Sequence, residues 1–297
     1  MVWLVDNRME AHVPRCHRNR YAPFLFLLLI SVCQIESSVY AGESDVRSGP
    51  DIVVGAEVFI WEEFNDADRR LLQETGVRYT LGVSKNNLDR RTAGPLYEVQ
   101  LRNYFGDLIY DGQTQSGQPL ETDVAYQGNQ LRVALGGRAR FETWPFINMV
   151  DVLGGLGIEN WTRDIEDGVT ASGVKALGIK ENYDVSFSEF GIGLMGQRGE
   201  STNYLQVGAR KPFQTREGVA IFDGPVTLSP GREWSMFAKY TFGHAAPSSR
   251  LGLTLYYESY RFSKSAPVST SIGGTPVLVL QPKSEMDVFG FQVEYRL

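Results

Sequence analysis

The residues best suited to covalent chemistry lie near position 245. His244 is followed by Ser248 and Ser249, and no other histidine occurs after residue 41. A serine nucleophile needs a base such as histidine oriented beside it, so a hydrolase site could form here and has no other base available. The alternative is a histidine exposed in a turn without a catalytic partner. Which interpretation holds depends on the element in which His244 lies.

Two other stretches have the composition of ligand sites. Asp164, Glu166 and Asp167 could offer carboxylate oxygens to Ca²⁺. Residues 154–157, Gly-Gly-Leu-Gly, are as rich in glycine as a phosphate-binding loop but lack the lysine that follows in such loops. The acids show no ligand spacing, and glycines in a strand also permit close packing. We therefore expect no metal ion and no cofactor.

The elements that carry these residues are predicted to be β-strands. Of the 297 residues 42% are hydrophobic and 22% are charged. From residue 52 onward apolar residues fall on every second position, which indicates strands with one apolar and one polar face. Only residues 66–74 fit a short helical turn. The ten alternating rows lie near residues 54–60, 77–83, 97–105, 131–135, 150–158, 190–194, 205–209, 234–242, 251–257 and 289–297.

Short and long connections alternate between these rows. The longer ones lie near residues 62–75, 111–129, 164–181, 214–230 and 265–283. This alternation is typical of membrane barrels, with short turns on one side and long loops on the other. The sequence predicts an all-β fold: a closed antiparallel up-and-down transmembrane β-barrel of about ten strands, with eight or twelve as alternatives. Residues 277–280, Val-Leu-Val-Leu, could extend a hairpin above the membrane or add strands. A soluble barrel or sandwich would alternate in the same way.

Charged and aromatic residues favour the membrane barrel. The polar faces hold full charges, and charges buried in a lumen must pair. A lumen charge network is expected from Glu98, Arg102, Arg132, Arg138, Glu258 and Glu294, with Glu57, Arg78, Glu189, Arg210, Lys239 and Arg296 also facing inward. Aromatic residues near row ends are expected to form girdles at the membrane interfaces. They are Trp61, Tyr97, Phe141, Trp144, Trp161, Trp234 and Tyr295.

The N-terminal segment has the layout of a secretory signal peptide. Arg15, Arg18 and Arg20 precede an apolar stretch over residues 22–33, and Ala41 completes a small-x-small cleavage site. Residues 1–41 are predicted to be this signal, residues 42–51 a short periplasmic lead-in and residues 52–297 the barrel. The true start could be Met1 or Met9. Both cysteines, Cys16 and Cys33, fall in the signal, so the mature chain would hold no disulfide.

The last row of the sequence predicts how the barrel closes. Its apolar positions are Phe289, Phe291, Val293, Tyr295 and Leu297. We expect this strand to pair with the first one, because lipid leaves an open sheet edge unsatisfied. The stretch resembles the closing strand of bacterial outer-membrane proteins, which the barrel assembly machinery reads. Residues 109–117, 253–265 and 281–284 also resemble a proteobacterial family of outer-membrane β-barrel domain proteins, small barrels of the OmpA-like or porin-like kind. That similarity implies location and fold but no activity.

Three functions fit such a barrel. The first is a non-enzymatic structural or loop-presenting role with a largely filled lumen, because long side chains of both signs can pair across it. The second is a narrow porin-like channel for small solutes. The third, an outer-membrane hydrolase, is disfavoured because His244 falls in a predicted periplasmic turn, whereas omptin surface proteases pair acids with a histidine near the outer rim. The net charge of −6 argues against nucleic acid as a partner. The expected partners are outer-membrane lipid, lipopolysaccharide and the barrel assembly machinery, and the expected state is a monomer.

Overall fold

The computed structural model describes residues 49–89, 92–114, 117–141, 147–198, 201–220, 224–244 and 251–297. The predicted signal peptide, Trp144, Ser248 and Ser249 lie outside these ranges. In the described part of the chain no helix is long and apolar enough to span a membrane. The strands are β1 (Asp51–Phe64), β2 (Arg70–Asn86), β3 (Gly94–Gln113), β4 (Pro119–Arg140), β5 (Met149–Ile165), β6 (Gly168–Val169), β7 (Lys175–Ala176), β8 (Lys180–Arg198), β9 (Ser201–Val219), β10 (Val226–Leu228), β11 (Ser235–His244), β12 (Leu251–Phe262), β13 (Val268–Ile272), β14 (Thr275–Val279) and β15 (Lys283–Arg296).

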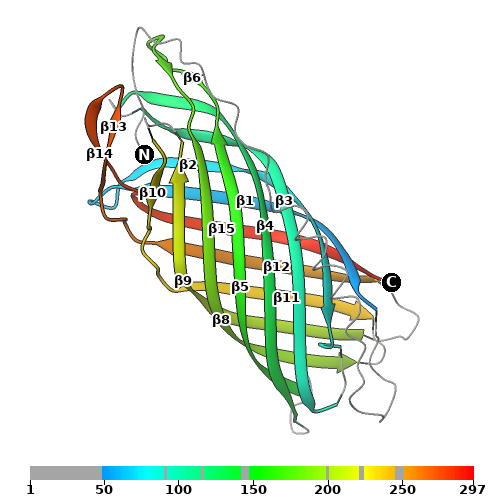
Figure 1. Ribbon diagram of the computed structural model, residues 1–297. Helices are drawn as coiled ribbons and strands as arrows, with labels where there is room; N and C mark the ends of the chain where they lie inside the picture. Colours follow the sequence, from blue (N-terminus) through cyan, green and yellow to red (C-terminus); the bar gives the residue numbers. More distant parts are fainter. Residues whose placement is uncertain are drawn as a thin grey trace.

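Ten of these strands form a closed antiparallel up-and-down barrel (Figure 1). Each pairs with its neighbours in sequence order, and β15 pairs with β12 on one side and β1 on the other. Val293, for example, lies opposite both Val54 and Leu253. The amide of Leu297 also donates to the carbonyl of Pro50 at 3.1 Å. The predicted fold is confirmed. Because β15 pairs with both neighbours, the ten-stranded sheet has no open edge.

The strands are tilted because the register is staggered around the barrel. From Gly55 on β1, one line of paired residues runs through β2, β3 and β4 and reaches Trp161 on β5. In the other direction the line runs through β15, β12, β11, β9 and β8 and reaches Met149 on the same strand. The two endpoints do not coincide, and such a displacement forces the strands of a closed barrel to tilt.

The barrel has two bands, which differ in whether apolar or polar residues face outward. The lower band, which we call the apolar belt, exposes aliphatic and aromatic residues on its outer surface. Val58, Leu81, Phe105, Leu156 and Phe190 are all exposed there. It lies toward the end of the barrel that carries Pro50 and Leu297, which we call the near end. Alternation in this band is apolar outward and polar inward, as the sequence predicted.

The upper band, which we call the outer barrel, reverses this arrangement. On β3, Leu108 and Tyr110 are buried inside, while Asp107 and Asp111 are exposed outside. The buried cluster of this band also contains Trp61 from β1, among other inward residues. Period-two alternation therefore continues, but the apolar positions move to the other face.

The long connections are mostly strand. Residues 111–129 were expected to form a long loop, yet β3 continues to Gln113 and β4 begins at Pro119. The helical turn expected over residues 66–74 is also wrong. Asn65 accepts hydrogen bonds from the amides of Ala67 and Arg69 through its side-chain oxygen, which closes a tight turn before β2. Residues 277–280 contribute to the hairpin of β13 and β14, a separate two-stranded sheet.

Candidate functional site

The candidate site is the polar lumen of the barrel. Even positions of β3, β4 and β12 and odd positions of β5 and β8 point inward, so the side chains of these strands meet across the interior. The structure places all twelve predicted charges at inward positions. Nine of them are buried: Glu57, Arg78, Glu98, Arg102, Arg132, Arg138, Glu189, Arg210 and Glu258.

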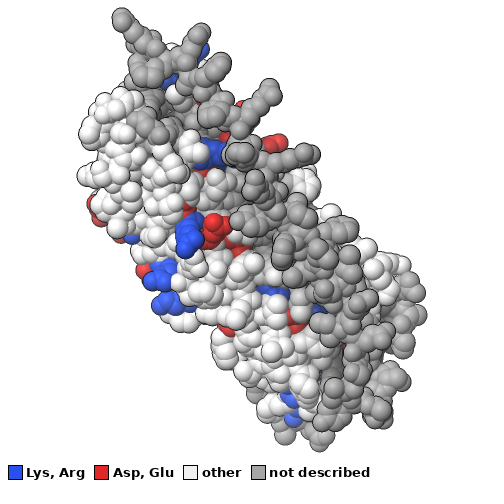
Figure 2. Space-filling model, viewed as in Figure 1, with Lys and Arg blue, Asp and Glu red and all other residues white. Residues whose placement is uncertain are grey.

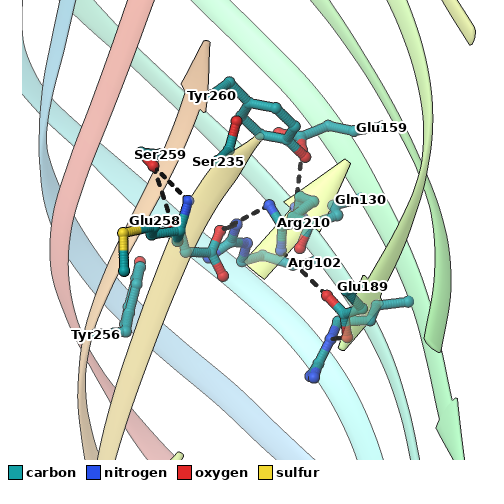
Figure 3. A network of polar contacts seen from close by, with 12 residues as sticks. Arg102, Gln130, Glu159, Glu189, Arg210, Ser235, Tyr256, Glu258, Ser259 and Tyr260 are labelled. Carbon is teal, nitrogen blue, oxygen red and sulfur yellow. Dashed lines mark hydrogen bonds and ion pairs between the residues drawn. The ribbon is translucent and has the colours of Figure 1, made fainter. Parts of the chain in front are cut away.

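A chain of ion pairs crosses the lumen at the level of the belt (Figure 3). Arg102 donates to Glu258 at 2.7 Å, and Arg210 lies 3.8 Å from the same carboxylate. Arg210 also lies 3.5 Å from Glu189, which accepts a hydrogen bond from Arg132. These side chains come from β3, β12, β9, β8 and β4, so the chain joins opposite walls of the barrel.

The same network continues at both of its ends. Arg132 lies 2.7 Å from Glu98, and Lys239 lies 4.0 Å from that carboxylate. On the other side Arg102 lies 3.9 Å from Glu57, which accepts from Arg78 at 2.7 Å. Each carboxylate in this set thus has a cation within ion-pair distance, which is the arrangement that buried charges require.

Aromatic residues also point into the lumen. The guanidinium of Arg78 lies between the rings of Phe59 and Tyr104, 4.1 Å from each centroid. Glu159 is held by three uncharged donors, Tyr104 at 2.8 Å, Tyr260 at 2.5 Å and Gln130 at 2.8 Å. A guanidinium group is stabilised when it stacks on an aromatic face, and a buried carboxylate is stabilised when it accepts hydrogen bonds.

Glycines at inward positions make room for aromatic rings in the lumen. A Cβ atom added at Gly157 would lie 2.2 Å from the ring of Phe187, and one added at Gly290 would lie 2.3 Å from the ring of Tyr256. The glycines of residues 154–157 therefore include one that serves close packing between strands. No phosphate-binding role is needed to explain it.

A second group of contacts lies at the near end. Arg138 donates to both oxygens of Asp151 at 2.7 Å and to the carbonyl of Leu88 at 2.8 Å. Arg296 donates to Asp51 at 2.7 Å in the same way. Glu294 is not part of an ion pair with these groups and accepts instead from the hydroxyl of Thr254 at 2.9 Å. Of the six residues predicted to form one network, Arg138 and Glu294 thus make separate contacts.

A third cluster, which sequence reasoning missed, lies inside the outer barrel. Arg163 donates to Glu63 at 3.1 Å, to Glu181 at 2.6 Å and to Glu74 at 2.8 Å. Glu217 lies buried in the same region, and no ion pair joins it to another described residue. One guanidinium therefore faces four carboxylates, all from the parts of their strands that lie above the apolar belt.

The excess of acid in this outer cluster shifts its titration. Burial raises the pKa of Glu217 well above its usual range, and the carboxylates of Glu181 and Glu63 raise that pKa further. Burial also raises the pKa of Glu74, although Arg163 opposes the shift. The alternation of the strands could have identified Glu63 and Glu74. Each lies an even number of residues from an inward position of its strand, Glu57 on β1 and Arg78 on β2.

The girdle prediction is wrong for two tryptophans. Trp61 and Trp161 are buried inside the outer barrel, where both pack against Tyr183 with ring centroids 5.6 and 4.8 Å away. Trp234, Phe141 and Tyr295 are exposed on the outer surface, as expected for girdle positions. The error follows from the reversal of faces above the belt.

The acidic residues considered for a metal site make other contacts. Asp164 pairs with Lys180 at 2.7 Å, and Asp167 accepts from the amide of Gly178. Among the described residues, no cluster of three or more histidine, cysteine or acidic residues could hold a metal ion. His244 ends β11 opposite Ser201, at the near end of the barrel.

The residues predicted to form the closing strand lie at the near-end half of β15. Phe289, Phe291, Tyr295 and Leu297 are exposed on the outer surface, and Val293 shares their side of the strand. Phe289 packs against Tyr257 of β12 with ring centroids 4.8 Å apart. The outward face of β15 is thus continuous with the apolar belt of its two neighbours.

Comparisons with known proteins identify the fold. No protein-family model matches the chain, and no curated protein does. Among solved structures, the outer membrane protease OmpT from Escherichia coli is similar with a TM-score of 0.55 and 8% identity, covering 88% of this chain and 100% of that one. The transport unit of the autotransporter AIDA-I from Escherichia coli gives a TM-score of 0.43 at 8% identity over 94% of this chain and 100% of that one. The translocator domain of the autotransporter NalP from Neisseria meningitidis gives 0.40 at 8% identity over 93% and 96%. At such identity the likeness to OmpT is one of fold alone: this chain has the fold of a ten-stranded outer-membrane barrel.

Proposed function

We propose that this chain is an integral protein of the bacterial outer membrane, with a filled lumen and a non-enzymatic role as a structural or surface-presenting barrel. The apolar belt supports the location, because a closed barrel with apolar residues outward and charges inward is matched to lipid. The fold shared with OmpT agrees with it. The polar outer barrel would stand above the membrane, and the hairpins β6–β7 and β13–β14 would be its surface features.

The observation that carries the filled lumen is the burial of its largest side chains. Arg78, Arg132, Arg163 and Arg210 are each no more than 2% exposed although they point into the barrel. Two pairs span the interior, Arg102 of β3 with Glu258 of β12 and Arg163 of β5 with Glu63 of β1, so they cross the path that a solute would follow. Small barrels have interiors that side chains can fill. A pore would require these pairs to separate and leave charges unpaired.

The test is the conductance of the refolded barrel in a planar lipid bilayer. We expect the native protein to show no steady current, and Arg102→Ala to open a leak because it removes bulk and a pair with Glu258. Exposed Arg70, which lies 3.2 Å from Glu62 outside the lumen, provides the control variant Arg70→Ala. Steady conduction by the native protein, with ion selectivity altered in Arg102→Ala, contradicts the filled barrel.

A narrow channel is the second candidate, and one feature of Arg210 favours it. Its guanidinium nitrogens are buried and make no hydrogen bond to a described residue, since its carboxylate contacts are 3.5 Å or longer. Buried polar groups of this kind are usually satisfied by water. A single row of water molecules beside Arg210 would let a small ionic current through the lumen, which the same bilayer measurement detects.

Export and assembly belong to the same proposal. Residues 1–41 would be removed as a signal peptide, and N-terminal sequencing of mature protein should find Gly42 or a residue near it. The barrel assembly machinery would read β15, whose outward face is apolar. We propose a monomer in lipid with lipopolysaccharide around it. The proposal assigns no catalytic residue, no cofactor and no nucleic-acid partner.

A further inference from the structure

A group of cations lies on the outer surface at the upper edge of the apolar belt. Lys211 and Arg216 are on β9, and Arg232 lies just ahead of β11. The register shifts between β8 and β9 near Ser186 and Phe187, so β9 is irregular at this level. Figure 2 shows basic side chains on the left flank of the molecule, where β9 and the start of β11 lie in Figure 1.

Contacts hold two of these cations beside exposed aromatic rings. The ammonium of Lys211 lies 5.2 Å from the ring centroid of Trp234. Arg232 donates a hydrogen bond to the backbone carbonyl of Phe213. Trp234 is 61% exposed and Phe213 is 51% exposed, so both rings face outward. Exposed aromatic residues beside cations are typical of the interface between lipid tails and headgroups.

These cations lack the acidic partners that four other exposed cations have. Arg70, Lys180, Lys264 and Lys283 each lie within 3.2 Å of a carboxylate. No carboxylate of a described residue lies within 4.0 Å of Lys211, Arg216 or Arg232. Asp184 is opposite Arg216 in the register, but it accepts a hydrogen bond from Asn160 instead. No ion pair with a described residue therefore engages these three cations.

We propose that Lys211, Arg216 and Arg232 bind the phosphate of a lipid headgroup in the outer leaflet, with Trp234 and Phe213 against its apolar part. Guanidinium and ammonium groups make charge-assisted hydrogen bonds to phosphate oxygens. The belt residue Met236 of β11, 66% exposed, lies two residues after Trp234 and would contact the acyl chains. The inference depends on the proposed outer-membrane location, and it names one lipid class for one flank of the barrel.

The test measures lipid binding by the full chain in neutral detergent. Bisphosphorylated and dephosphorylated lipid A are titrated separately, and the midpoint of thermal unfolding gives the apparent affinity. We expect binding of the phosphorylated lipid only. The double variant Lys211→Gln with Arg232→Gln should lose at least about tenfold in affinity, the size expected for one charge-assisted hydrogen bond.

A matched control separates this site from general surface charge. The double variant Lys180→Gln with Lys264→Gln removes two exposed cations that already have carboxylate partners. Its affinity should stay within about twofold of the native value, because those charges are neutralised within the protein. An equal loss in both double variants overturns the proposal, as does equal binding of the dephosphorylated lipid or full competition by inorganic phosphate. A native barrel that resides in the outer membrane but does not bind the phosphorylated lipid overturns this inference alone.

Discussion

The apolar belt and the outer barrel are built from the same strands, yet their faces are opposite. On β5, Leu156 and Ile158 point outward in the belt, while Trp161 and Ile165 point inward above it. The strand does not change its geometry between them; the surroundings outside do. Lipid selects apolar residues for the outer face, and water selects polar ones. Under the proposed membrane location, the position of the reversal on a strand such as β5 would mark where the membrane ends.

The interiors of the two bands differ as well. In the belt, Glu57, Glu98, Glu189 and Glu258 each lie within ion-pair distance of an arginine. In the outer barrel, Arg163 serves three carboxylates and Glu217 has no ion pair with a described residue. We infer that the belt interior is balanced in charge, whereas the outer interior depends on bound protons to reach balance.

The largest expected effect comes from truncating the strand that closes the barrel. Deleting residues 291–297 removes the near-end half of β15 and its pairs with β1 and β12 in the apolar belt. Because an open edge in lipid leaves backbone groups unsatisfied, no stable barrel should form. Heat-modifiable migration on gels measures closure. A truncated chain that still migrates as a compact, heat-modifiable species would show that the near-end half of β15 is dispensable.

The belt network should give the next largest effect. Arg132→Ala leaves Glu98 and Glu189 without their closest cation, which should cost about 3–5 kcal/mol of unfolding free energy. Arg70→Ala, which removes an exposed pair with Glu62, should cost at most about 1 kcal/mol. Denaturant unfolding in lipid vesicles gives both values. Similar costs for the two variants would mean that the lumen is hydrated and its charges are screened.

The boundary between the bands predicts a third difference. Leu156→Arg places a charge on the exposed outer face of the belt and should cost about 2–4 kcal/mol. Asn160→Arg, four residues along the same strand, should cost little, because this position is exposed beside Asp184 in the outer barrel. Unfolding in vesicles compares the two. Equal costs would place both residues in the same environment and remove the proposed boundary.

The smallest effect concerns pH and the outer cluster. The pKa of Glu217 is raised in the folded protein, so the folded state binds more protons than the unfolded one. Its contribution to stability is fully present below the ordinary glutamate pKa of about 4.3 and is lost as pH rises through the raised folded value. Glu217→Gln should therefore flatten the fall in stability on the alkaline side. Unfolding at a series of pH values tests this, with exposed Glu166→Gln as the control. A native slope unchanged by Glu217→Gln would show that another group carries the protons.

Period-two patterning predicted most of the fold but not the length of its strands. The outward rows found in the sequence, such as Val150 and Val152 on β5, end where the apolar residues leave the outer face. Beyond that point the same strand continues with Asn160 and Thr162 outward, which are polar and fall outside the apolar row found in the sequence. Trp161 was assigned outward for the same reason. Counting every second residue from the inward positions earlier in the same strand would have placed Trp161 inside the barrel.

The sequence by itself determined the strand pattern, the closure by β15 and the inward parity of charges such as Arg102 and Glu258, because alternation along a strand is a local property. Only the tertiary structure decided which charges meet. Arg102 and Glu258 are far apart in the chain, and the stagger of the closed sheet sets their heights in the lumen. The outer cluster around Arg163 likewise exists because β1, β2, β5 and β8 extend above the belt to the same level. Pairing across a barrel depends on shear and tilt, which no single strand encodes.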